Sequence, residues 1–281
     1  MYLQYFSLKE EPFNMTPDPR FLFFSNQHEA AIESLLYGIR QRKGFLTLTG
    51  EIGTGKTTLC RELINRLDPQ TQIAAILNPL LSVPGLLKAI NQDFDNPVEG
   101  EAAETQLDGL NHFLLSGVEK GRNAVVLIDE AQNLSVEALE MTRLLSNLET
   151  DKQKLLQIIL VGQPELEKTL QNPHLRQLAQ RINIRYHLRQ LNMEETREYI
   201  FHRLLVAGGE GQLHFEEKAI KGIFRYSEGY PRLINILCDR SLLAAYAAKT
   251  RIIHLPIVKE ALRDVNGYFQ PSWWRRLCRL Y

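Results

Sequence analysis

One stretch constrains the fold of this chain more than any other: residues 45–63, which read FLTLTGEIGTGKTTLCREL. It begins with a short run of β-branched and apolar residues and continues through a glycine-rich turn. It then has the composition of a helix that begins at Lys56 or Thr57. Residues 50–57 fit G-x-x-x-x-G-K-[ST] at every position. A strand, a glycine-rich turn and a helix in this order form a loop that binds phosphate groups. The stretch therefore predicts an α/β fold that binds a nucleotide.

The residue types of this loop suit a polyphosphate. Glycines allow backbone angles and close approaches that a Cβ atom forbids, so successive N–H groups can turn inward on the ligand. Lys56 supplies a mobile charge for the β- and γ-phosphates, and Thr57 supplies a hydroxyl for Mg²⁺. A chance match would arise in about one such chain in a hundred, which favours the functional interpretation. The expected nucleotide contacts are Gly50, Glu51, Ile52, Gly53, Thr54, Gly55, Lys56, Thr57 and Thr58.

Length and charge limit the class of protein. At 281 residues the chain exceeds the usual size of one domain, so one large or two unequal domains are expected. Lysine plus arginine and aspartate plus glutamate are equal, at 33 each. No overall charge therefore draws the chain to nucleic acid or anionic lipid. Any such contact must be a local patch.

The cysteines and the N-terminus bear on location. Cys60, Cys238 and Cys278 lie far apart without C-x-x-C spacing, which argues against zinc and against a disulfide framework and favours a reducing compartment. The N-terminus lacks the apolar run of a signal peptide, and no stretch of about 18 apolar residues occurs. We therefore expect a soluble, cytoplasmic protein.

The first 24 residues are rich in aromatic residues and proline. Because so much aromatic area is costly to leave in water, we expect this segment to lie on the main domain. Two placements remain open, over the nucleotide base or as ordinary core packing. A helix is predicted next, over residues 25–42, with Ser25 or Asn26 as its N-cap and Gly44 as its stop.

A second stretch carries two adjacent carboxylates. Residues 124–128, AVVLI, are typical of a parallel strand buried on both faces, and Asp129 and Glu130 follow directly. Open α/β sheets place ligands at this end of their strands. We expect Asp129 to hold Mg²⁺ through water and Glu130 to orient and deprotonate the attacking water. The alternative is a strand end capped by two solvated acids, but the phosphate loop upstream favours the catalytic interpretation.

Other strands and helices complete the predicted α/β core. Residues 155–161 form a buried strand, and Gln163 after it is either a polar turn residue or a hydrogen-bond partner of the γ-phosphate or the attacking water. Residues 182–188 alternate, so that Ile182 and Leu188 face one way and Arg185 the other. The remaining expected elements are a strand over 72–77 that ends at Asn78, helices over 83–94, 107–120, 135–148 and 173–180, and a loop over 95–104.

After Arg189 the pattern changes to helices only, which predicts an all-α second domain. Pro231 suits a first helical position, and Arg232 projects from the same first turn. The predicted helices cover 194–207, 215–227, 231–248 and 256–266. The tail, 267–281, is basic and aromatic without an acid. It is either a segment at a membrane interface or an amphipathic helix docked on the domain.

In this order, the phosphate loop, the Asp129-Glu130 strand end, Gln163, Arg181 at a helix-to-strand junction and GYPR at 229–232 resemble an AAA+ ATPase. The resemblance implies a P-loop NTPase core with a parallel sheet and a C-terminal all-α lid. The expected organisation is an N-terminal segment, an α/β core, a helical lid and a tail, over residues 1–24, 25–189, 190–266 and 267–281.

The resemblance also implies roles by position. Lys56 and Thr57 match the Walker A lysine and hydroxyl, and Asp129 and Glu130 match Walker B. Gln163 matches sensor 1, where Asn, Ser or Thr is commoner, and Arg232 matches the sensor 2 arginine that reaches the γ-phosphate. Asn78 matches the polar partner that holds the Walker B glutamate inactive. Arg181 matches the arginine finger, with Arg176 as runner-up.

Within that superfamily, YFSLKEEPFNMTPDPRFLF, the helix with His28 and Glu29, and DEAQNL resemble the general secretion pathway A-type ATPases, the ExeA family, over residues 1–269. This implies ATP and Mg²⁺ as cofactors, a homo-oligomer, and an inner-membrane secretion or pilus assembly protein as partner at the cytoplasmic face of that membrane. Long members continue through a membrane span into a periplasmic peptidoglycan-binding domain, whereas this chain stops at Tyr281. It is either a short member with a separate membrane partner or a cytoplasmic fragment. In either case the tail is a candidate membrane contact.

Two other functions remain open. One is a DNA-dependent ATPase of the transposition-regulator (TniB-like) or initiator type. The arginines between 176 and 189 favour it, whereas the zero net charge and the short tail after the lid oppose it, so nucleic acid is not the expected partner. The other is a switch-like binding protein that uses ATP to change partners with little turnover.

Overall fold

The structure is a computed structural model that describes residues 2–15, 18–77, 79–150, 153–209, 211 and 213–266. The chain divides into two compact units. Residues Asn26–Arg189 form an α/β unit, and Met1–Ser25 together with the chain from Gln190 onward form a mainly helical unit. Asn78 and the tail from residue 267, for which the sequence predicts roles, lie outside the described residues.

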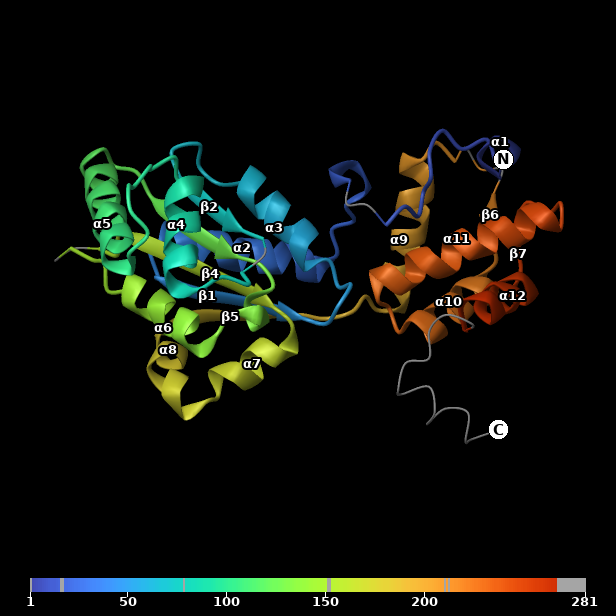
Figure 1. Cartoon of the computed structure of the whole chain (residues 1–281). Coiled ribbons are helices and arrows are strands. Elements are labelled where there is room, and N and C mark those ends of the chain that lie inside the picture. The colour runs from blue at the N-terminus through green and yellow to red at the C-terminus, as the bar shows by residue number, and fades with distance from the viewer. Residues whose placement is uncertain are drawn as a thin grey trace. The chain divides into compact units, whose positions relative to one another are not determined.

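A five-stranded parallel sheet forms the centre of the α/β unit (Figure 1). Its order is β2 (Gln72–Ile76), β3 (Ala124–Ile128), β4 (Leu156–Gly162), β1 (Phe45–Gly50) and β5 (Ile182–Leu188). Every neighbouring pair runs in parallel, which confirms the five predicted strands and the predicted sheet type. Because β4 lies between β1 and β3, the residues that follow these three strands lie side by side at one edge of the sheet.

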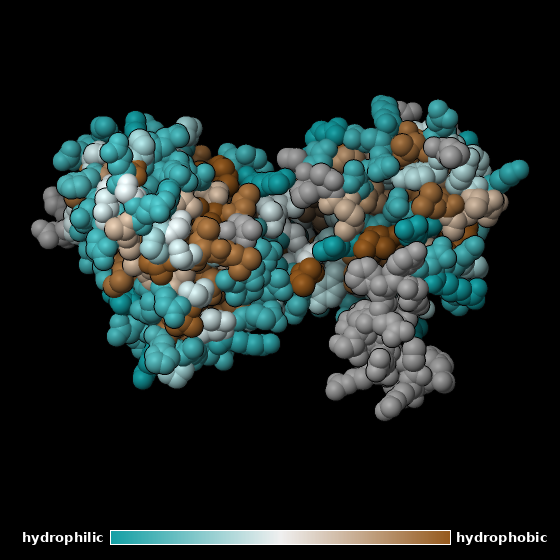
Figure 2. Space-filling model, in the orientation of Figure 1, coloured by the Kyte–Doolittle hydropathy of each residue, from teal (hydrophilic) through white to brown (hydrophobic). Residues whose placement is uncertain are grey.

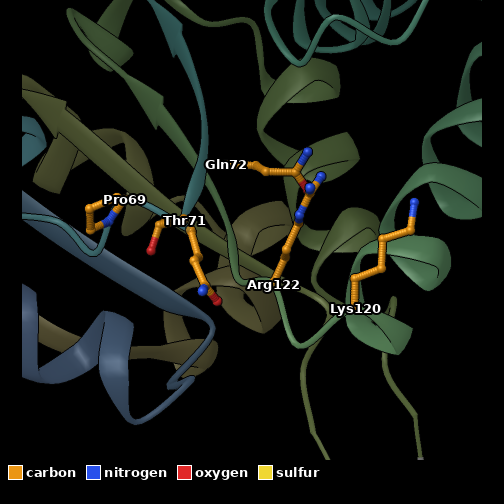
Figure 3. A pocket seen from close by; sticks show the side chains of 6 residues that line it. Pro69, Thr71, Gln72, Lys120 and Arg122 are labelled. Carbon is orange, nitrogen blue, oxygen red and sulfur yellow. The ribbon is translucent and has the colours of Figure 1, made fainter.

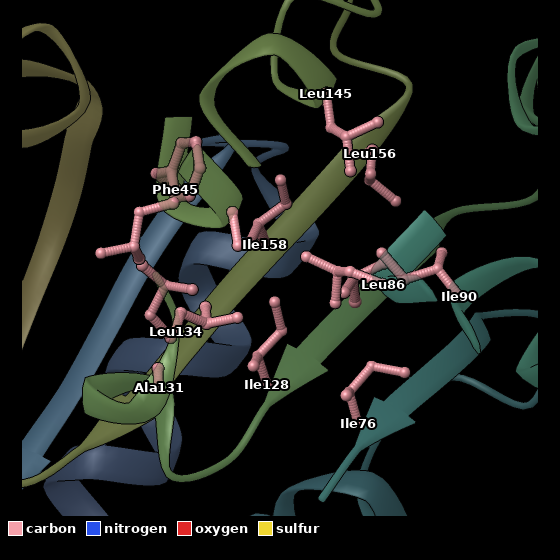
Figure 4. Packing of buried hydrophobic residues seen from close by; sticks show 14 of the residues in the cluster. Phe45, Ile76, Leu86, Ile90, Ile128, Ala131, Leu134, Leu145, Leu156 and Ile158 are labelled. Atoms are coloured by element: carbon pink, nitrogen blue, oxygen red, sulfur yellow. The ribbon is translucent and has the colours of Figure 1, made fainter. Parts of the chain in front are cut away.

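Helices cover both faces of this sheet. Helix α2 (Asn26–Arg40) packs on β1 and β5 so closely that a Cβ atom on Gly38 would lie 2.3 Å from Leu46 and 2.7 Å from Ile184. On the other face a continuous core joins the strands to several helices, and Figure 4 shows part of it. Ile128 and Ile158 belong to the strands of this core. Its helices include α4 (Val83–Asp93), α5 (Ala103–Glu119) and α6 (Val136–Leu145).

Two parts of the α/β unit differ from the sequence prediction. Helix α5 begins at Ala103 rather than at residue 107, because its N-cap residue, Ala102, has no side chain that could signal the start. A helix that was not predicted, α7 (Pro164–Leu170), follows β4 directly, with Pro164 at its first position. The remaining elements are α3 (Lys56–Asn65), the 3-10 turns η2 (Ala131–Asn133) and η3 (Pro173–Leu175), and α8 (Arg176–Arg181).

The helical unit contains the four predicted helices, α9 (Met193–Val206), α10 (Glu217–Ser227), α11 (Pro231–Ala247) and α12 (Leu255–Asn266). The prediction of helices only is wrong, because β6 (His214–Phe215) pairs in parallel with β7 (Ile252–Ile253). Strands of two residues are too short to produce the alternation by which a strand is predicted.

The aromatic N-terminal segment packs within the helical unit, so the expectation that it lies on the main domain is wrong. Arg203 of α9 holds it by donating hydrogen bonds to the carbonyl oxygens of Pro12 at 2.5 Å and Asn14 at 3.0 Å. The same guanidinium lies 4.9 Å from the ring centroid of Phe21. The segment contains the short helix α1 (Tyr2–Tyr5) and the 3-10 turn η1 (Pro19–Phe21), and its buried aromatic residues are Phe6, Phe13 and Phe21.

The surface of each unit is mainly hydrophilic, with hydrophobic residues interspersed, on the face that Figure 2 shows. Some large hydrophobic side chains of the α/β unit are strongly exposed, among them Ile52 in the phosphate loop and Leu77 and Leu80 after β2. Among the helices of the described residues, none has both the length and the apolar character that a membrane span requires.

Candidate functional site

The phosphate loop runs from the end of β1 into α3, and its glycines meet two different needs. Gly53 and Gly55 have φ angles of 81° and 99°, which strain any residue with a side chain. A Cβ atom on Gly50 would lie 2.6 Å from the carbonyl oxygen of Leu188 on β5. Helix α3 begins at Lys56, as predicted, so the loop ends on the free N–H groups of a helix N-terminus.

Lys56 lies folded back into this loop. Its Nζ donates hydrogen bonds to the carbonyl oxygens of Gly50 at 2.7 Å and Glu51 at 2.9 Å, and the residue is 7% exposed. Burial lowers the pKa of Lys56, while the charges of Glu130, Asp129 and Glu51 act in the opposite direction. The side chain is thus a buried cation held by neutral carbonyls. A phosphate could replace those carbonyls with a stronger, charge-assisted contact.

Thr57 and Asp129 bring the two predicted motifs into contact. The hydroxyl of Thr57 donates a 2.8 Å hydrogen bond to Oδ2 of Asp129, which lies at the end of β3 and is 4% exposed. Both are hard oxygen ligands of the kind Mg²⁺ prefers, and Mg²⁺ commonly takes one or two protein ligands with phosphates and water completing the octahedron. In the described ranges, no group of three or more His, Cys, Asp or Glu residues could hold a metal without such help. The pair therefore fits a magnesium ion brought by a nucleotide.

Glu130 is held in an unusual conformation. Its φ angle is 51°, in the left-handed region that few residues other than glycine adopt. Its backbone N–H donates to Oδ1 of Asp129 at 2.8 Å. Its Oε2 accepts hydrogen bonds from Nε2 of Gln132 at 2.5 Å and from Nε2 of Gln163 at 3.3 Å. Backbone strain of this kind is concentrated at functional sites.

Gln163 therefore lies in contact with Glu130, and Gln132 is a site residue that the sequence reasoning missed. The only signal in the sequence was a polar residue two positions after Glu130 in DEAQNL. That signal does not by itself assign a role, because Gln163, the second partner of Gln132, lies beyond the next strand. The backbone N–H of Gln163 donates to Oε1 of Gln132 at 3.0 Å.

Further polar contacts surround the phosphate loop. Oγ1 of Thr49, the residue before Gly50, donates to Oε1 of Glu167 on α7 at 2.5 Å and lies 3.0 Å from Nδ1 of His187. Nε2 of His28 lies 3.3 Å from the carbonyl oxygen of Thr54. These contacts connect the loop to α7 and to α2.

The first candidate arginine finger, Arg181, lies away from this site. Arg181 directly precedes β5, so it lies at the opposite edge of the sheet from its own phosphate loop, about 20 Å away at ~3.3 Å per strand residue. Its Nη1 donates to Oγ of Ser146 at 2.8 Å and to Oδ1 of Asn147. Arg181 therefore cannot reach the nucleotide site of its own chain. Arg176, at the start of α8, is exposed.

Arg232 lies on the helical unit, exposed in the first turn of α11 as predicted. The turn before it depends on Gly229, where a Cβ atom would lie 1.9 Å from the carbonyl oxygen of Leu191. The role of Arg232 at a nucleotide stays a prediction.

A pocket lies where β2 and β3 begin, at the edge of the sheet opposite the phosphate loop (Figure 3). Two cations and no acid line it. Its residues are Pro69, Gln70, Thr71, Gln72, Lys120 and Arg122. This is a local basic patch on a chain without net charge.

The fold and the site define a P-loop protein of the AAA+ class, with a parallel α/β core and a helical C-terminal region. Residues 39–170 match the family model described as an AAA domain, and the chain belongs to this superfamily. General secretion pathway protein A of Aeromonas hydrophila is 45% identical to it over 276 residues, which are 98% of this chain and 50% of that protein. The resemblance to the general secretion pathway A family is thereby confirmed. The chain spans half the length of that relative.

Solved structures share the fold. The Drosophila ORC bound to DNA aligns with a TM-score of 0.72 at 18% identity, over 100% of this chain and 69% of that chain. The Aeropyrum pernix ORC2 protein aligns with a TM-score of 0.69 at 17% identity, over 94% and 73%. The Thermotoga maritima RuvB Holliday junction branch migration motor aligns with a TM-score of 0.58 at 21% identity, over 86% and 70%. At these identities the likeness shows the fold alone.

Proposed function

We propose that the protein is a magnesium-dependent ATPase that couples ATP binding and hydrolysis to the assembly or localisation of a bacterial cell-envelope secretion or pilus complex. The observation that carries the enzymatic part is the contact between Thr57 and Asp129. It joins the phosphate loop to the acidic strand end beside Glu130. The relative of Aeromonas hydrophila supports the secretion part.

The side chains suggest a division of labour. Lys56 exchanges its loop carbonyls for the β- and γ-phosphates of ATP. Thr57 and Asp129 hold Mg²⁺, which when bound neutralises charge on the phosphates. Glu130 accepts the proton of the attacking water, and Gln163 fixes the direction of that water or of the γ-phosphate. Arg232 of the lid reaches the γ-phosphate.

Hydrolysis in this proposal requires a neighbouring subunit. Because Arg181 lies at the sheet edge opposite its own phosphate loop, it acts on the ATP of another copy. A positioned arginine contributes roughly 10³ to 10⁵ in rate in related phosphoryl transfers. Arg176 is the alternative, since it is exposed whereas Arg181 contacts Ser146 and Asn147.

The proposed place of action is the cytoplasmic face of the inner membrane, with an inner-membrane secretion or pilus assembly protein as partner. The tail, residues 267–281, supplies the contact with the membrane surface, because it is basic and aromatic and contains no acid. Binding to anionic liposomes that is lost on deletion of residues 271–281 would support this location.

A DNA-dependent ATPase is the second candidate, and the basic pocket favours it. DNA binding driven by Lys120 and Arg122 would weaken steeply as salt rises and would weaken further in a Lys120→Glu, Arg122→Glu variant. The Drosophila ORC and RuvB structures concern proteins that act on DNA, but the zero net charge of this chain opposes the assignment.

The deciding experiment measures ATP turnover by the purified full chain with and without Mg²⁺. Turnover that requires Mg²⁺ supports the proposal. Nucleotide binding with negligible turnover, also in the presence of membrane partners, would instead indicate a switch-like binding protein.

A further inference from the structure

We propose that Gln132 is a positioning residue that ties the catalytic base Glu130 to the end of β4, so that the place of the base depends on the place of Gln163. The inference rests on the proposed ATPase function and concerns the same site. It starts from two hydrogen bonds, one at each end of the Gln132 amide.

The Gln132 amide can take only one direction between its two partners. A backbone N–H can only donate, so the atom of Gln132 that faces N–H of Gln163 at 3.0 Å must be its oxygen. The amide nitrogen must then face Oε2 of Glu130, 2.5 Å away. The two partners thus fix an orientation that side-chain amides often leave ambiguous.

The Gln132 side chain lies close to the end of β4. Gln132 lies in η2, a turn anchored by the fully buried Ala131. Its oxygen approaches the end of β4 so closely that a Cβ atom on Gly162 would lie 2.8 Å from it. Gln132 thus bridges Glu130 and Gln163 through two hydrogen bonds, and this bridge depends on the absence of a side chain at residue 162.

The hydrogen bonds from the two glutamine amides leave one oxygen of Glu130 without a partner from them. Gln132 and Gln163 both donate to Oε2 of Glu130, at 2.5 and 3.3 Å. Within the described part of the chain, Oε1 of this carboxylate accepts no hydrogen bond, and it is the oxygen left to accept a proton from water. The two amides thus hold one oxygen of the base and direct the other.

Helix α7 connects Gln163 to the residue before the phosphate loop. Gln163 is the N-cap of α7, and Glu167 of α7 accepts a hydrogen bond from Thr49, the residue before the phosphate loop. A shift of the loop or of Gln163 when the γ-phosphate arrives or leaves would pass through α7 and Gln132 to Glu130. Gln132 would then couple the presence of the γ-phosphate to the position of the Glu130 carboxylate.

The test replaces Gln132 by Glu, which keeps the length and the acceptor for N–H of Gln163 but turns a negative oxygen toward Glu130. We expect kcat to fall about 10- to 100-fold, the effect of losing a hydrogen bond to a charged group, with ATP affinity unchanged. Gln132→Leu keeps neither hydrogen bond of the amide and should lower kcat to a similar extent, again with ATP affinity unchanged. A fall in kcat without a loss of affinity distinguishes a positioning role from a structural one.

Asn133→Ala, an exposed neighbour in the same turn, is the matched control and should keep wild-type kcat. Full turnover in both Gln132 variants beside an active wild type would overturn this inference alone. An equal loss of ATP affinity and of kcat in both variants would reduce Gln132 to a structural residue and would also overturn it. A wild-type chain that binds ATP without turnover would overturn the proposed function and this inference together.

Discussion

The hydroxyl of Thr57 donates a 2.8 Å hydrogen bond to Oδ2 of Asp129, a residue of a different strand. The fold thus places the two candidate magnesium ligands within hydrogen-bond distance of each other. The two side chains lose their conformational entropy on folding, so the binding of Mg²⁺ does not require that loss again.

Removal of this hydroxyl should therefore act through the metal. Thr57→Val keeps the shape of the side chain. We expect it to lower Mg²⁺-dependent turnover by roughly 10- to 100-fold or more, because the loss of a residue that supports a metal ligand typically has an effect of this size. Thr57→Ser should restore most of the activity. Titration of turnover with Mg²⁺ checks this, and equal Mg²⁺ requirements in the wild type and Thr57→Val would contradict it.

Lys56→Ala should lose affinity for ATP by about 10- to 100-fold, because a charge-assisted contact to phosphate disappears. Calorimetric titration with ATP measures the loss. Lys120→Ala is the matched control, since Lys120 is exposed and lines the pocket at the opposite edge of the sheet. Equal affinity in both variants would show that the phosphates bind elsewhere.

ATP binding should take up protons at alkaline pH. Burial lowers the pKa of Lys56 below its ordinary value of 10.5, so part of the Lys56 population loses its proton as the pH rises toward 10.5. Phosphate charges favour the protonated form and raise this pKa on binding. Titrations in two buffers with different ionisation enthalpies reveal the uptake, which should shrink as the pH falls below the folded pKa of Lys56 and should be absent in Lys56→Ala.

The lowered pKa of Lys56 also affects how the free energy of unfolding depends on pH. The folded chain binds the Lys56 proton more weakly than the unfolded chain, so this group adds to the free energy of unfolding as the pH rises from its folded pKa toward 10.5. Lys56→Ala should lose that rise.

Glu130→Gln should bind ATP with wild-type affinity and turn it over roughly 10²- to 10⁴-fold more slowly, the contribution typical of a general base. Single-turnover measurements separate the chemical step from nucleotide binding. Turnover at the wild-type rate would mean that another group accepts the proton.

Mixing two inactive variants tests the arginine finger. Arg181→Ala keeps an intact site and Glu130→Gln keeps an intact arginine, so their mixture should recover activity that neither shows alone. Turnover per subunit of the wild type should also rise with protein concentration. If Arg181→Ala is active while Arg176→Ala fails alone and recovers in the mixture, Arg176 is the finger.

The features that could be predicted from the sequence are those whose physical cause lies in neighbouring residues. The phosphate loop and the strand before Asp129 follow from neighbouring residues, and both lie where they were expected. Gln132 could not be assigned, because its role depends on Gly162 and the end of β4. The aromatic area of the N-terminal segment indicated burial but not the surface that buries it.

The contact of Arg203 with the carbonyl oxygens of Pro12 and Asn14 has a consequence for synthesis on the ribosome. The helical unit is discontinuous in sequence, and the whole α/β unit is inserted between its first part and the rest. At ~5–20 residues per second, roughly 10–40 s separate the emergence of Phe6 and Phe13 from that of α9. The newly made aromatic segment must therefore be shielded, by a chaperone or by the growing chain, until its docking surface has been translated.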